Sequence, residues 1–201
     1  MYGTIKFNIG RITTLFIALC ILLYIFPLID LKDGAFNFSL VFKEPWRILT
    51  SMFLHSTLPH LFYNMLSLFI FGNLIEIHCG SKNFLLVSFV SGIFGSFAFG
   101  IMNPATYSVG ISGVIFGLIG SAVVLFPDTK ALMPVGIISI PAKVKFAGPM
   151  IAFGELVMGF FPSHIGHHAH FGGFFVGVLL GFYLRKNIYP KEEFPLGEVE
   201  L

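Results

Sequence analysis

Charged residues are scarce in this chain and cysteines are few. Asp, Glu, Lys and Arg make up 11% of the 201 residues, whereas a soluble domain carries roughly 25%. The scarcity excludes an ordinary soluble domain, and a net charge of +2 indicates no nucleic-acid partner. Cys20 and Cys79 belong to separate apolar segments, which excludes a disulfide framework and leaves neither cysteine with metal-ligating neighbours. Apolar residues, by contrast, reach 56% and include 26 phenylalanines.

The apolar residues form stretches of the length that crosses a bilayer, about 17–25 residues. We therefore predict an all-α polytopic membrane protein with six transmembrane helices and no cleaved signal peptide. The expected spans are 12–29, 58–77, 83–101, 112–127, 146–162 and 168–185. Pro149 and Glu155 interrupt the fifth, and the apolar stretch from Met133 to Pro141 is too short to cross. A short N-terminus (1–11), a six-helix core (12–186) and a short C-terminal tail (187–201) complete the predicted organisation.

The distribution of lysine and arginine orients these spans. Six crossings place both termini on one side, where nine of the 12 basic residues then lie, against Lys32, Lys43 and Arg47 on the other. By the positive-inside rule, both termini are predicted to be cytoplasmic in a multi-pass protein of the cell membrane.

This topology brings polar residues of three spans to one depth. His60 and Asn64 lie near the start of the second span, Ser112 begins the fourth, and His170 lies near the start of the sixth. Residues 103–110, before Ser112, must then descend as non-helical chain, which is tolerated at membrane depth only against protein or a water-filled cavity. We therefore expect a wet pocket open to the outside.

Ser112 and His170 could act together as nucleophile and general base. At a helix start, unpaired backbone N–H groups and the helix dipole favour an oxyanion next to the serine, although serine there is also a common N-cap. Glycines at helical spacing in both spans would let the two helices approach closely and bring the side chains together. Alternatively, these glycines serve packing alone and His170 is a buried hydrogen-bonding residue. The glycines are Gly113, Gly117, Gly120, Gly173, Gly177 and Gly181.

His60 and Asn64, spaced i and i+4, share one helix face and could both donate hydrogen bonds to a developing oxyanion. The alternative is that they hold neighbouring helices together.

No carboxylate is expected beside the serine and histidine. Glu155 falls in the middle of the predicted fifth span, too deep to orient His170, so a Ser–His dyad is favoured over a triad. His164, His167 and His168 crowd before His170, and His55 precedes His60, which raises a metal alternative. Without the fixed spacing of zinc ligands, we expect no metal and no cofactor.

Four motifs resemble those of the rhomboid intramembrane serine proteases, in order along nearly the whole chain. They are Trp46-Arg47, His60-Leu61-Phe62-Tyr63-Asn64, Gly110-Ile111-Ser112-Gly113 and Ala169-His170-Phe171-Gly172-Gly173. The resemblance implies a six-helix bundle with Ser112 as nucleophile, His170 as base, and an oxyanion hole of His60, Asn64 and the Ser112 N–H group. It also implies a first outer loop partly in the membrane and a fifth span that acts as a lateral gate.

The resemblance further implies cleavage of transmembrane protein substrates near their outer ends, within the lipid bilayer. Phe116 stands where many members of the family carry tyrosine; it keeps a ring to pack on His170 but has no hydroxyl. Two alternatives remain at this point. One is a non-catalytic binder or chaperone of membrane helices on the same fold, and the other is a small transporter, for which no inverted repeat is evident.

Overall fold

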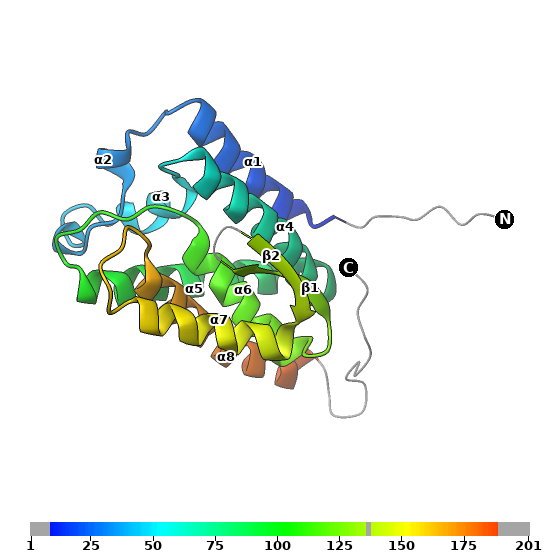
Figure 1. Ribbon diagram of the computed structural model, residues 1–201. Coiled ribbons are helices and arrows are strands. Elements are labelled where there is room, and N and C mark those ends of the chain that lie inside the picture. The colour runs from blue at the N-terminus through cyan, green and yellow to red at the C-terminus, as the bar shows by residue number, and fades with distance from the viewer. Residues whose placement is uncertain (1–8, 136–137, 189–201) are drawn as a thin grey trace.

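The computed structural model describes residues 9–135 and 138–188. Within them, six helices begin within two residues of the predicted starts (Figure 1). They are α1 (Arg11–Ile25), α4 (Leu58–Cys79), α5 (Ser81–Met102), α6 (Ser112–Leu125), α7 (Val144–Met158) and α8 (His167–Ile188). Most of the predicted N-terminal segment (1–11) and of the tail (187–201) lies outside the described residues.

Two of the described helices, α4 and α5, are both long and apolar enough to cross a membrane, so the count of six crossings stays a prediction. The apolar helices α1 and α6 are shorter, at 15 and 14 residues. At 1.5 Å per residue, α6 extends over about 21 Å, less than the roughly 30 Å of a hydrocarbon core. Helix α6 alone is therefore too short to cross the core, and the depth of Ser112 below the membrane surface stays a prediction.

Helix α6 is the centre of the bundle. Twelve of its 14 residues are buried, and α4, α5, α7 and α8 all pack against it (Figure 1). A helix that is apolar on every side is stable only when its neighbours cover it completely. The first residue of α6, Ser112, is therefore held by a rigid element.

Helices α6 and α8 meet through backbone atoms, as the glycine spacing predicts. A Cβ atom at Gly177 would lie 2.0 Å from the Gly117 carbonyl oxygen, and one at Gly173 would lie 2.1 Å from that of Gly113. Ser121 Oγ also donates a hydrogen bond of 2.8 Å to the Gly177 carbonyl. No side chain larger than hydrogen fits at Gly173 or Gly177, which confirms that these glycines bring the two helices together.

The segment between α1 and α4 is structured, although the sequence predicted only a loop there. The guanidinium group of the buried Arg47 holds it together. This group donates hydrogen bonds to the Glu44 carboxylate and to the carbonyl oxygens of Lys32 (2.7 Å) and Ala35 (3.0 Å). These hydrogen bonds fold the segment back on itself. Its elements are α2 (Leu31–Gly34), η1 (Phe38–Leu40) and α3 (Arg47–Phe53).

The fold is all-α, as predicted, apart from a two-stranded antiparallel hairpin between α6 and α7. It consists of β1 (Lys130–Val135) and β2 (Ile138–Lys143), with Lys130 paired to Lys143. At its base, the ammonium groups of Lys145 (2.7 Å) and Lys143 (3.1 Å) bind Asp128. These hydrogen bonds hold the pKa of the Asp128 carboxyl below its ordinary value.

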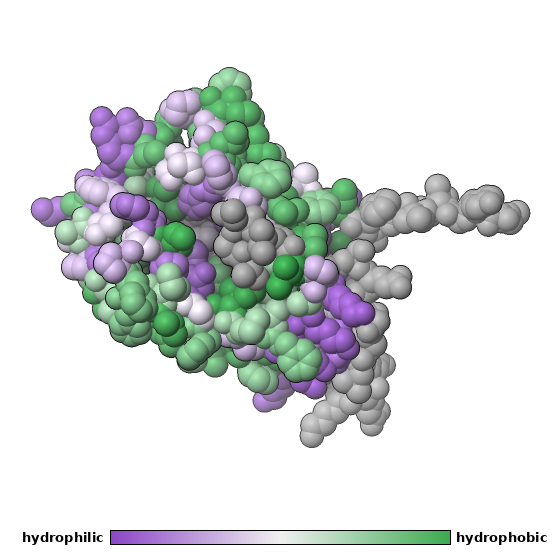
Figure 2. Space-filling model, in the orientation of Figure 1, coloured by the Kyte–Doolittle hydropathy of each residue, from purple (hydrophilic) through white to green (hydrophobic). Residues whose placement is uncertain are grey.

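The surface is largely apolar. Figure 2 shows hydrophobic residues along the flanks of the molecule, with hydrophilic residues gathered near α2 and at the opposite end of the same face. Large side chains that no other described part of the chain covers include Leu15 and Leu22 of α1, Phe146 and Met150 of α7, and Phe182 of α8. Exposed apolar surface of this extent indicates contact with a non-aqueous medium.

Candidate active site

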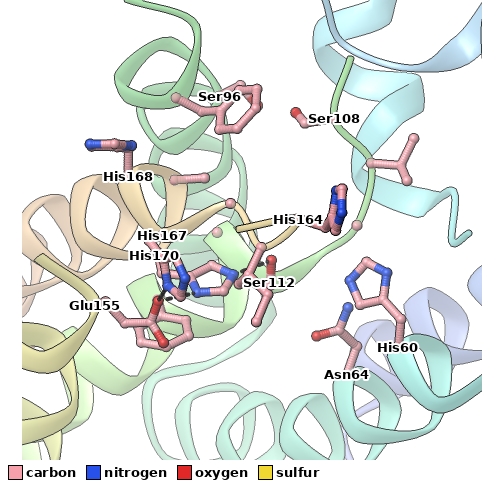
Figure 3. A pocket seen from close by; sticks show the side chains of 18 of the residues that line it. His60, Asn64, Ser96, Ser108, Ser112, Glu155, His164, His167, His168 and His170 are labelled. Carbon is pink, nitrogen blue, oxygen red and sulfur yellow. Dashed lines mark hydrogen bonds and ion pairs between the residues drawn. The ribbon is translucent and has the colours of Figure 1, made fainter. Parts of the chain in front are cut away.

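The hydroxyl of Ser112 points to His170 rather than to its own helix. Ser112 is the first residue of α6; the N-cap is Ile111, and no side chain caps this end. Ser112 Oγ lies 2.8 Å from His170 Nε2, which is hydrogen-bonding distance (Figure 3). The alternative of Ser112 as a simple N-cap is therefore wrong.

The chain before Ser112 is irregular, as predicted, and is held against the segment between α1 and α4. Phe36 and Ser108 exchange backbone hydrogen bonds, and Gly110 N–H donates to the Ser51 carbonyl at 2.9 Å. Gly110 has φ +121°, and a Cβ there would lie 2.7 Å from His60 Nε2. Glycine is required at this position because of both its backbone conformation and the adjacent imidazole.

The imidazole of His170 is fixed by an aromatic neighbour. His170 is buried near the start of α8, and the Phe116 ring stacks on it at 4.4 Å between centroids and 5° between planes. Phe116 lies one turn after Ser112 on α6. The prediction that this phenylalanine packs on the histidine is confirmed.

The expectation that Glu155 lies too deep to reach His170 is wrong. Glu155 Oε2 lies 2.9 Å from His170 Nδ1 (Figure 3). The predicted span extended to residue 162, but α7 ends at Met158. Glu155 is therefore in the last turn of α7, level with the first turn of α8, rather than in the middle of a span. A carboxylate thus contacts His170 at the ring nitrogen that faces away from Ser112.

His167 shares that carboxylate. Its Nδ1 lies 2.5 Å from the same Glu155 Oε2. Its other ring nitrogen, Nε2, is buried and has no hydrogen-bond partner among the described residues. One carboxylate oxygen on α7 therefore meets two imidazoles on α8.

A cavity of about 820 Å³ joins these residues to His60 and Asn64. His60 and Asn64 project from α4 on the far side of the cavity from His170 (Figure 3). Both lie beside the loop that leads to Ser112, since a Cβ at Gly110 would be 3.5 Å from Asn64 Nδ2 as well as close to His60. The four residues predicted to form the site thus line one cavity.

The sequence did not predict a contact between His55 and Asn64. Asn64 Nδ2 lies 3.0 Å from His55 Nε2. Burial, together with the nearby charge of His60, lowers the pKa of His55 to about 4. His55 is therefore neutral near pH 7, and its contact orients the Asn64 amide beside the cavity. The only signal in the sequence was a histidine in the turn before α4.

Among the described residues, one group of side chains has the composition of a metal site, namely Glu155, His167 and His170. Their potential ligand atoms lie within 4.8 Å of one another. This group differs from the all-histidine set considered from the sequence, because His164 and His168 are not part of it. Two ligands on a tetrahedral zinc ion stand about 3.3 Å apart. The 2.5 and 2.9 Å separations here are instead those of hydrogen bonds.

The family model described as the Rhomboid domain matches residues 43–187. The chain belongs to the rhomboid family. Membership in this family makes it a membrane protein, in agreement with its apolar surface. The matched range contains Ser112, His170, Glu155, His60 and Asn64.

Several curated relatives support the assignment. RHOMBOID-like protein 1 of Arabidopsis thaliana is 35% identical over 153 residues, which cover 75% of this chain and 38% of the plant protein. Rhomboid protease GluP of Bacillus subtilis is 34% identical over 188 residues, covering 84% of this chain and 34% of that protein. Rhomboid protease GlpG of Yersinia pestis is 26% identical over 193 residues, 92% of this chain and 66% of the relative. The chain thus spans little more than a third of the first two relatives.

Proposed function

We propose that the protein is an intramembrane serine endopeptidase that cleaves transmembrane segments of other membrane proteins near their outer ends. The observation that carries the proposal is the 2.8 Å contact between Ser112 Oγ and His170 Nε2 in a cavity of a rhomboid-family chain. The protease names of two relatives add to it. Both termini are proposed to be cytoplasmic, so that the cavity opens to the outside.

In the proposed reaction, His170 Nε2 takes the Ser112 hydroxyl proton as Oγ attacks the scissile carbonyl carbon. The C–N bond then breaks, and His170 gives that proton to the leaving amine. Water from the cavity, deprotonated by His170, hydrolyses the acyl-enzyme and restores Ser112. A substrate helix must unwind locally, because its carbonyl oxygens are otherwise engaged in helical hydrogen bonds.

His60, Asn64 and the Ser112 N–H group are proposed to bind the oxyanion. As the first residue of α6, Ser112 has an N–H group without a partner inside the helix. The Asn64 amide, oriented by its contact with His55, lies beside Gly110 together with the His60 ring. Donors held in place before the reaction stabilise developing charge without reorganisation.

The decisive test is cleavage of a model transmembrane substrate in liposomes by wild type, Ser112→Ala and a control, Ser96→Ala. Ser96 lines the same cavity from α5 and has no role in the proposed reaction. We expect Ser112→Ala to abolish cleavage and Ser96→Ala to retain it. Undiminished cleavage by Ser112→Ala would contradict the assignment of Ser112 as the nucleophile.

Labelling by a fluorophosphonate probe separates this function from that of a non-catalytic helix binder on the same fold. The proposal requires labelling that depends on both Ser112 and His170. A folded wild-type protein that fails to react would favour the binder instead.

A further inference from the structure

The proposed reaction leaves a partly buried carboxylate of the cavity, that of Glu155, without a role. Glu155 lies in an apolar helix, and its side chain is only 19% exposed. An ionisable group in such a place is costly unless it is paired, and it commonly marks a function. Among the described residues that line the cavity, Glu155 is the one acidic residue.

The contacts of Glu155 determine where the protons of the two histidines lie. Its Oε2 atom meets Nδ1 of His167 and Nδ1 of His170, and a carboxylate oxygen can only accept. Each Nδ1 must therefore carry a hydrogen. In the neutral form of His170, Nε2 is then the unprotonated nitrogen, which is the one that can accept the Ser112 hydroxyl proton.

The surroundings of His167 agree with this distribution of protons. Its Nε2 is buried without a hydrogen-bond partner among the described residues. A buried N–H group without an acceptor is costly, whereas a bare ring nitrogen is less so. His167 thus donates from Nδ1 and holds the Glu155 carboxylate in place beside His170.

We propose that Glu155 is a positioning residue that extends the Ser112–His170 pair to a Glu–His–Ser relay, with His167 orienting the carboxylate. The inference rests on the proposed protease function. It assigns Glu155 two effects: it selects the His170 tautomer that can accept the serine proton, and it stabilises the imidazolium that forms when His170 takes that proton.

A purely structural reading is that Glu155 only ties α7 to α8. The two readings differ in what Glu155→Gln does. Glutamine keeps the size and the hydrogen-bonding ability of the side chain but loses the charge, and its amide nitrogen can favour the wrong histidine tautomer. If Glu155 only connects α7 to α8, Glu155→Gln should keep its activity. If Glu155 acts through His170, the same variant should lose most of its activity.

The test measures substrate cleavage and the rate of fluorophosphonate labelling in Glu155→Gln, Glu155→Asp, Ser112→Ala and a control, His168→Asn. His168 lines the same cavity but does not contact Glu155 in the described structure. We expect Glu155→Gln to lower kcat and the labelling rate on the order of 10²- to 10⁴-fold, as loss of the orienting carboxylate does in serine hydrolases. KM and the midpoint of thermal unfolding should change little. Glu155→Asp should recover part of the rate, and His168→Asn should match wild type.

Rates of Glu155→Gln within twofold of wild type would overturn the inference. The proposed function would still stand if Ser112→Ala were inactive in the same experiment. Cleavage by Ser112→Ala would instead contradict the proposed function itself. The experiment therefore distinguishes failure of the inference on Glu155 from failure of the proposed function.

Proton NMR provides a second measurement that does not depend on reaction rates. An imidazole N–H group bonded to a carboxylate should give a low-field resonance, assigned to His170 by its loss in His170→Ala. Its absence from the folded wild-type protein would also overturn the inference.

Discussion

The imidazole of His170, on α8, is held by residues from two other helices. Ser112 of α6 meets Nε2 of His170, Glu155 of α7 meets Nδ1, and the Phe116 ring covers one face. These contacts restrict rotation of the histidine both within its plane and out of it. The reactive geometry therefore depends on α6, α7 and α8 together.

Replacing Phe116 should show what the stacked ring contributes. We expect Phe116→Leu to lower kcat/KM for a transmembrane substrate roughly 2- to 12-fold, because an aromatic pair contributes about 0.5–1.5 kcal/mol beyond its buried area. Phe116→Tyr keeps the ring and should retain activity. Equal kcat/KM values for Phe116→Leu and wild type would contradict a role for the stack.

At this scale the sequence predicted Ser112, His170, His60 and Asn64 through motifs, and the structure places all four around one cavity. It could not predict Glu155. The position of Glu155 depends on where α7 ends, and the apolar residues that follow Met158 extend the hydropathy pattern without extending the helix. A carboxylate one turn from a helix end was therefore misread as a mid-span residue.

Among the elements, the pair of α6 and α8 determines how close the serine and the histidine come. Their glycines let one backbone lie directly against the other, and Ser121 fixes the register through its hydrogen bond to Gly177. Side chains of ordinary size would hold helix axes 8–10 Å apart. Hydrogen-bonding distance between Ser112 and His170 thus depends on residues several turns away.

Gly177→Ala should disrupt both the bundle and the site. The added Cβ would lie 2.0 Å from the Gly117 carbonyl oxygen, a backbone atom that cannot rotate away. We expect a loss of about 1–3 kcal/mol in the free energy of unfolding and slower fluorophosphonate labelling.

Gly154→Ala is the matched control, because a Cβ at Gly154 meets nothing within 4 Å. Thermal unfolding in detergent and labelling rates provide the comparison. If the two alanine variants behaved alike, close backbone packing would not be what positions the site.

Helix starts were well predicted from the sequence, whereas the connections were not. Ser112 and Leu58 begin α6 and α4 as expected, because glycine, proline and polar residues interrupt the apolar pattern there. The hairpin at Lys130–Lys143 and the helices between residues 31 and 53 have no such pattern. They are specified by long-range partners, such as the carbonyl oxygens that accept from Arg47.

For the molecule as a whole, the apolar flanks and polar ends fit a protein that lies across a bilayer (Figure 2). The buried Cys20 and Cys79 are the two native cysteines, so labelling at introduced cysteines can test the orientation once both are replaced.

In a Cys20→Ala/Cys79→Ala background, we expect Ser39→Cys to react with a membrane-impermeant maleimide in intact cells. Lys82→Cys should react only after permeabilisation, because the predicted topology places residues 39 and 82 on opposite sides. Both residues are exposed in the structure, so burial would not prevent the reaction. Labelling of both from the same side would refute the proposed orientation.

Glu155 lies on a different helix from Ser112 and His170. Ser112 and His170 belong to α6 and α8, which glycine contacts lock together, whereas α7 buries mainly small residues and a single valine: Val144, Ala147, Gly148 and Ala152. An outward displacement of α7 would withdraw the carboxylate from both imidazoles and leave the serine and histidine in contact. If Glu155 has the proposed role, such a displacement would slow the reaction of Ser112 without separating Ser112 from His170.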